Sequence, residues 1–138
     1  MFETFDHTAD IGLRVAAGTL EELFVEAARG LTSLLVENSD DVRGAVEETV
    51  SLTGQELDYL LFDWLNELLF RFETRQMLFR EFSVSVRVSD SVLEATVRGE
   101  PCDRARHRLA HEVKAITYHG LCVEQTEKGW RAEMILDI

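Results

Sequence analysis

The first residues able to do chemistry lie near the start of the chain, in the segment 5–12, Phe-Asp-His-Thr-Ala-Asp-Ile-Gly. Two carboxylates, Asp6 and Asp10, and the imidazole of His7 stand beside small residues, just before an alternating apolar run. Charged groups are costly to bury unless they are paired or bound to a metal ion. The segment therefore predicts the start of a functional site rather than a piece of the core.

Another carboxylate stands near the other end of the chain, at Asp137, followed by Ile138 with the terminal carboxylate. If Asp10 begins the first strand and Asp137 ends the last, pairing of these strands brings the two acids together. Carboxylates that share a site repel each other, and a hard divalent cation such as calcium or magnesium removes that cost. Asp6, Asp10, Asp137 and the terminal carboxylate of Ile138 are therefore the candidate ligands of a metal site. The alternative is that both aspartates are solvated at strand ends.

Three histidines, His7, His107 and His111, are further candidates for a metal site. His7 is either a further ligand or a residue that orients Asp10, and Asp6 is its neighbour in the motif. His107 and His111 are four positions apart, but no glutamate follows His107 as in the HExxH pattern of zinc proteases. We therefore favour a structural role for this pair.

Lys114 lies in the segment 112–119, Glu-Val-Lys-Ala-Ile-Thr-Tyr-His. A lysine among apolar residues needs an anion or a route to solvent. It would meet a phosphate, a carboxylate of a partner or the acidic site, or it would be solvated like most strand lysines. The pattern assigns no role to His119.

The elements that must position these residues follow from the spacing of apolar side chains. Period-2 alternation predicts strands over 10–16, 42–53, 78–88, 92–98, 112–118, 121–126 and 130–138. Helical spacing predicts amphipathic helices from a capping box at Thr19 to about Val36, and from Gln55 to about Arg75. The segment 103–111 is a short helix or a loop. We expect an α+β fold in which two amphipathic helices cover one face of a largely antiparallel sheet.

The composition limits the classes of protein that remain. A length of 138 residues with 46% hydrophobic residues suits one domain, 1–138. A net charge of −12 disfavours direct binding to a nucleic-acid backbone. Two cysteines outside any metal motif, no signal-peptide pattern and no long apolar run lead us to expect a cytoplasmic protein that does not enter membranes.

Several motifs of common enzymes are missing from the sequence. We find no GxSxG, no P-loop and no GxGxxG after a predicted strand. These absences weigh against nucleotide hydrolysis and acyl transfer. They leave open a metal-assisted reaction at the acidic residues.

The chain resembles the archease family over nearly its whole length. The resemblance begins with the segment 6–12, Asp-His-Thr-Ala-Asp-Ile-Gly, and continues through 20–24, the helix that ends in Gly30-Leu31, and 60–69. It returns with Gly99-Glu100, with His107, with the segment 112–121 and with 136–138 at the end. The segments 6–12 and 112–121 are the most specific of these.

The resemblance implies a role in tRNA processing without catalysis by the protein itself. Archeases are protein cofactors of the GTP-dependent RNA-splicing ligase. They promote guanylylation of its active-site histidine, which allows multiple turnover, and they broaden its choice of nucleotide. Some are connected to a tRNA methyltransferase as chaperone-like partners. The family's calcium-type site maps onto Asp10, Asp137 and Ile138, and its activating lysine onto Lys114.

We therefore expect a non-enzymatic activator of a tRNA-splicing RNA ligase, with Asp10, Lys114 and Asp137 as the activating residues and Ca²⁺ as the cofactor. The alternatives are a metal-dependent phosphoesterase that uses the same acids, and a chaperone for a tRNA-modifying enzyme. We expect no direct contact with nucleic acid.

Overall fold

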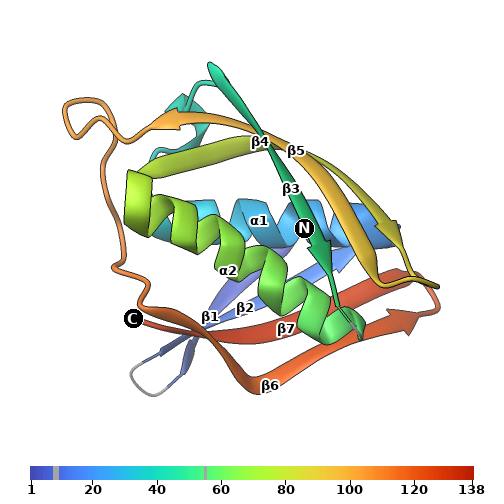
Figure 1. Cartoon of the computed structure of the whole chain (residues 1–138). Helices are drawn as coiled ribbons and strands as arrows, with labels where there is room; N and C mark the ends of the chain where they lie inside the picture. Colours follow the sequence, from blue (N-terminus) through green and yellow to red (C-terminus); the bar gives the residue numbers. More distant parts are fainter. Residues whose placement is uncertain (8–9, 55) are drawn as a thin grey trace.

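The computed structural model describes residues 1–7, 10–54 and 56–138 (Figure 1). Its helices and strands follow one another as β1 Phe2–His7, β2 Asp10–Ala17, α1 Leu20–Leu35, β3 Val46–Thr53, α2 Leu57–Arg75, β4 Met77–Arg87, β5 Val92–Pro101, β6 Ala115–Thr126 and β7 Gly129–Asp137, with a short 3-10 helix at Ser39–Asp41.

The strands form two antiparallel sheets, one of four strands in the order β1-β2-β7-β6 and one of three in the order β3-β5-β4. Both helices contact both sheets: α1 lies against β2 and β4, and α2 lies against β6 and β3 (Figure 1). The expected α+β class is confirmed, but the strands divide into two sheets where one was expected. The alternation within a strand shows that one face is buried, but it does not show which strands share a sheet.

Helix α1 begins where the capping box predicted. The Thr19 hydroxyl accepts a hydrogen bond from the Glu22 N–H at 3.2 Å, and Thr19 itself has an extended backbone. The apolar side chains of α1 are buried at the predicted spacing, and they are Leu20, Leu23, Phe24, Ala27, Ala28, Leu31, Leu34 and Leu35.

Helix α2 supplies the largest fully buried side chain, Trp64. Its indole Nε1–H donates a hydrogen bond to the Phe24 carbonyl oxygen at 2.9 Å, which joins α2 to α1 in the core. The helix ends at Arg75 and is capped by Gln76, which donates its N–H to the Phe72 carbonyl at 2.7 Å and turns the chain out of the helix with its left-handed backbone (φ 58°). The predicted first residue of this helix, Gln55, lies outside the described residues.

Other boundaries differ from the expectation. Strand β1 was not predicted, because Phe2–His7 is rich in polar residues. Strand β3 begins at Val46 rather than Val42, although Val42 is buried in the core. For the segment 103–111, where the sequence allows a short helix or a loop, the structure shows a loop with a turn. The two predicted strands over 112–126 are one strand that begins at Ala115.

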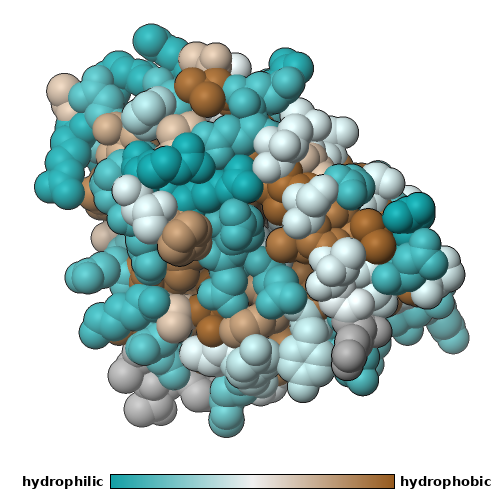
Figure 2. Space-filling model, viewed as in Figure 1, coloured by the Kyte–Doolittle hydropathy of each residue, from teal (hydrophilic) through white to brown (hydrophobic). Residues whose placement is uncertain are grey.

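The exposed surface is mainly polar. Figure 2 shows a mostly hydrophilic face on which hydrophobic side chains form small separate groups. In the part of the chain that the structure describes, we find no helix with the length and apolar character needed to span a bilayer.

Candidate metal and activator site

The two aspartates predicted to meet are neighbours in the four-stranded sheet. β2 pairs antiparallel with β7, and Asp10 lies directly opposite Asp137. Residues opposite each other in such a pair have Cα atoms about 4.5–5.5 Å apart. The two carboxylates therefore start from adjacent points on neighbouring strands, although 126 residues separate them in sequence.

This register is set by the core. The pairs that follow Asp10–Asp137 inward are Ile11 with Leu136 and Leu13 with Met134, and all four side chains are buried. A shift of one residue would turn these side chains out of the core, so the apolar pattern holds the register. Because side chains alternate along a strand, Asp10 and Asp137 point to the outer face of the sheet, and both are half-buried.

The glycine of the N-terminal motif has a packing role beside this site. A Cβ atom on Gly12 would overlap the ring of Phe5, which covers this position from β1. Phe5 lies directly across from Gly12 in the β1–β2 pair. On its other side the ring carries the Arg14 guanidinium, whose central carbon is 4.4 Å from the ring centroid. Gly12 thus allows the Phe5 ring of β1 to lie over the strand that carries Asp10.

The remaining motif residues lie on β1 or beyond it. Asp6 pairs with Ile11 and is exposed, whereas His7 pairs with Asp10 through the backbone. A role for the His7 side chain stays a prediction, because that side chain lies outside the described part of the structure. Thr8 and Ala9, which complete the motif between the strands, are outside it as well.

Lys114 is anchored to the same end of the sheet. Its backbone N–H donates a hydrogen bond to the Asp137 carbonyl oxygen at 2.8 Å, and the next residue, Ala115, pairs with Asp137. Val113 and Ile116 on either side are buried, whereas Lys114 is exposed. Within the described chain its ammonium group forms no ion pair, so it is available to a group from outside.

The donors at this end of the sheet fit a hard cation. Asp10, Asp137 and the terminal carboxylate of Ile138 all offer oxygen, the ligand atom that Ca²⁺ and Mg²⁺ prefer. Over residues 1–7, 10–54 and 56–138, no three His, Cys, Asp or Glu side chains are close enough to hold a metal ion. The hypothesis therefore needs the terminal carboxylate as its third ligand. Such a cation would neutralise the repulsion between the two aspartates.

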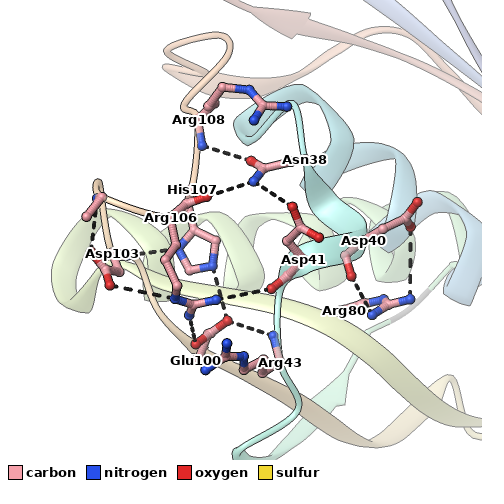
Figure 3. A network of polar contacts seen from close by, with 11 residues as sticks. Asn38, Asp40, Asp41, Arg43, Arg80, Glu100, Asp103, Arg106, His107 and Arg108 are labelled. Atoms are coloured by element: carbon pink, nitrogen blue, oxygen red, sulfur yellow. Dashed lines mark hydrogen bonds and ion pairs between the residues drawn. The ribbon is translucent and has the colours of Figure 1, made fainter.

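His107 belongs to a different structure, the polar network drawn in Figure 3, in which His107 and Glu100 are buried. Its Nδ1 accepts the Asp103 N–H at 2.8 Å, so the proton is on Nε2, which donates to Glu100 Oε2 at 3.1 Å. His111 lies elsewhere and donates its backbone N–H to the Leu34 carbonyl at 2.8 Å. These contacts support the structural role favoured for His107, whereas a structural role for His111 stays a prediction because its side chain is exposed.

Glu100 is the centre of this network, although it was not predicted to be a site residue. Its carboxylate accepts the Arg43 backbone N–H at 2.7 Å and a hydrogen bond from the Arg106 guanidinium (Figure 3). Burial alone would raise the pKa of Glu100, but the bonds from Arg43 and His107 and the charge of Arg106 hold it below its ordinary value. The only indication of this pair in the sequence was that Glu100 and His107 are both among the residues that carry the resemblance to the family.

The network fastens the loop that leads to Lys114. Asn38, just after α1, donates its side-chain amide to the Arg106 carbonyl and accepts the Arg108 N–H, both at 2.8 Å. Ala110 then donates its N–H to the Leu35 carbonyl at 2.9 Å. The loop is therefore bound along the end of α1 before it enters β6.

The comparisons with known proteins concern the chain as a whole. The model of the Archease protein family (MTH1598/TM1083) matches residues 2–138. The chain belongs to the archease family. It is 40% identical to the protein archease of Methanopyrus kandleri over 139 aligned positions, which cover 99% of each chain. It is 36% identical to the archease of Pyrococcus furiosus, with 99% of this chain and 98% of the relative covered.

Solved archease-type structures share the fold. The solution structure of Methanobacterium thermoautotrophicum protein 1598 superposes with a TM-score of 0.83 at 35% identity, covering 99% of this chain and 98% of that one. An archease of Thermotoga maritima, described as a possible chaperone, superposes with a TM-score of 0.67 at 19% identity and covers 100% and 98%. At 19% identity the second likeness concerns the fold alone.

Proposed function

We propose that this archease is a non-catalytic activator of a GTP-dependent RNA-splicing ligase. In this proposal it acts in the cytoplasm and promotes guanylylation of the ligase's active-site histidine, so that the ligase turns over repeatedly with a wider choice of nucleotide. The observation that carries the proposal is the meeting of Asp10, Asp137 and the backbone of Lys114 at one end of the sheet, in a chain of this family.

The chemistry of the three residues suits this task. A cation held by Asp10, Asp137 and Ile138 would present open positions to the phosphates of GTP, which are hard oxygen ligands. The Lys114 ammonium is exposed and forms no ion pair with a described residue, so it can add positive charge near a phosphate. Guanylylation builds charge on the phosphates as the histidine attacks, and charge placed beforehand lowers that barrier.

The test is a guanylylation assay with purified ligase, GTP and this protein. The wild-type protein should raise the rate at which labelled guanylate appears on the ligase. Asp10→Asn, Asp137→Asn and Lys114→Ala should each remove most of the stimulation. Glu127→Gln, an exposed acid in the β6–β7 turn, is the matched control and should stimulate normally.

Two results would change the proposal. Folded Asn variants that stimulate fully would overturn the site, and a wild-type protein without effect on the ligase would overturn the function. Hydrolysis of a generic phosphodiester that a chelator stops would favour the phosphoesterase. The T. maritima relative is described as a possible chaperone, and improved solubility of a tRNA methyltransferase, independent of Asp10 and Lys114, would favour that role.

A further inference from the structure

An exposed cluster of aromatic side chains joins α2 to β6. The ring of Tyr118 on β6 stacks on Phe62 of α2, with centroids 4.0 Å apart and planes 25° apart. It meets Tyr59 edge-on, with centroids 5.6 Å apart. Tyr118 is 59% exposed and Tyr59 is 48% exposed. The three rings are therefore held in fixed mutual positions while much of their surface remains in solvent.

A carboxylate that has no partner among the described residues borders this cluster. Asp63 comes four residues after Tyr59, so the two side chains lie on the same side of α2. Asp63 is half-buried, and this burial raises the pKa of its carboxyl group. In the described residues no cation and no hydrogen-bond donor contacts its carboxylate. The positive charge of a guanidinium group from another molecule would offset the cost of burying this carboxylate. The same group would also lie over an aromatic ring.

The cluster is close to the candidate activator site. Tyr118 is three residues along β6 from Ala115, which pairs with Asp137, a separation of about 10 Å at the usual strand rise. An interface of ordinary size buries about 800 Å² on each partner. Tyr118 faces α2 whereas Asp137 faces outward, so one partner covers both sites by reaching around β6, the edge strand of this sheet.

We propose that Tyr59, Phe62, Asp63 and Tyr118, here called the α2–β6 surface, bind an arginine-bearing segment of the ligase that the acidic site activates. This inference rests on the proposed function. Arginine matches the surface because its planar cation stacks on aromatic rings and pairs with a carboxylate. The net charge of −12 adds attraction for a basic partner. A second copy of this chain is disfavoured, since it would bring the same negative charge to the interface.

The experiment measures the affinity of purified ligase for this protein by calorimetry, together with stimulation of guanylylation. Tyr118→Ala, Tyr59→Ala and Asp63→Asn should each weaken binding by at least about tenfold, as expected for central interface residues. Tyr118→Phe should bind nearly as the wild type because the stacked ring remains. Val88→Ala, which alters a 54% exposed residue after β4, and Glu127→Gln are the matched controls.

The outcomes separate this inference from the proposed function. If the wild type binds and stimulates, and the three variants bind equally well, the α2–β6 surface is not the binding site, while the proposed function stands. If the wild type neither binds nor stimulates, the function fails and the inference fails with it. Should Tyr118→Ala lower the melting temperature, Asp63→Asn decides alone because it keeps the packing. A wild-type dimer that Tyr118→Ala dissociates would assign the surface to a second copy and would overturn the inference.

Discussion

His107 and Glu100 form a hydrogen-bonded pair in which Nε2 of the imidazole lies 3.1 Å from Oε2 of the carboxylate. The His107 side chain has no exposed surface, and the Glu100 side chain is 11% exposed. The pair lies between the end of β5 and the loop that leads to Lys114. Its stability should therefore affect the loop as well as the fold.

The pair gives an acid-sensitive contribution to stability. The pKa of Glu100 is lower in the folded state than its ordinary value, so the unfolded chain takes up a proton first as the pH falls. The contribution is complete above the ordinary glutamate pKa of about 4.3 and disappears as the pH falls through the lowered folded value. Glu100→Gln should cost about 3 kcal/mol at pH 7, because it leaves buried donors poorly paired.

Urea unfolding at pH 7, 4.5 and 3 measures this effect. The difference in unfolding free energy between wild type and Glu100→Gln should shrink toward pH 3. Glu127→Gln, which is exposed, should show little difference at any pH. A difference for Glu100→Gln that stays constant across the three pH values would contradict the argument.

Gly12→Ala should destabilise the protein by about 2 kcal/mol, because the added methyl group would overlap the Phe5 ring. Phe5→Ala in the same chain should restore much of the loss, since the overlap is with a side chain that can be removed. Gly99→Ala is the contrasting variant, because its methyl group would meet the backbone carbonyl of Leu78. Thermal unfolding of the two single variants and the double variant measures the coupling, and independent effects of Gly12→Ala and Phe5→Ala would contradict it.

Trp64→Phe should cost about 3 kcal/mol. The change removes the hydrogen bond from the indole to the Phe24 carbonyl and leaves a cavity where the larger ring was. Chemical denaturation should show this loss with little change in the slope against denaturant. Phe70→Ala, at a position 57% exposed on the same helix, should change stability far less. Equal losses for the two variants would show that Trp64 is not the core residue described here.

Calcium should raise the melting temperature if Asp10, Asp137 and Ile138 hold it. A ligand at 100 times its Kd stabilises the folded state by about 2.7 kcal/mol. Asp137→Asn should remove the shift, and so should extra residues added after Ile138, because they move the terminal carboxylate away. Titration calorimetry checks the binding directly. Equal calcium affinity in the extended chain would exclude the terminal carboxylate as a ligand.

The sequence predicted the helices and the pairing of Asp10 with Asp137 for a physical reason. A run such as Ile11, Leu13 and Val15 must face the core, and it matches Leu136, Met134 and Ala132 on β7. Local signals were also sufficient at Thr19, whose hydroxyl caps α1 as the capping box required. At Thr19 a pattern within a few residues specifies the outcome, whereas the alternation in β2 shows its buried face and the choice of β7 as its partner came from the expectation that the two ends of the chain meet.

The parts that were missed depend on contacts between distant segments. Strand β1 has a mixed sequence and is held by its pairing with β2 and by the Phe5 ring over Gly12. The Glu100–His107 pair joins the end of β5 to a loop of mostly polar residues. This contact does not follow from the spacing of apolar side chains. The division into two sheets depends on which strand each helix covers. The order of elements along the chain does not state this choice.

The place of β7 in its sheet has a consequence for synthesis. It follows the other described strands in sequence, yet it lies between β2 and β6 and pairs with both. While residues 129–137 are still inside the ribosome, one edge of β2 is free. The apolar residues of β7 that pack against α1 are also missing. Such long-range pairing is slow to form. This sheet, and with it the meeting of Asp10 and Asp137, can therefore be completed only after residues 129–137 have left the ribosome.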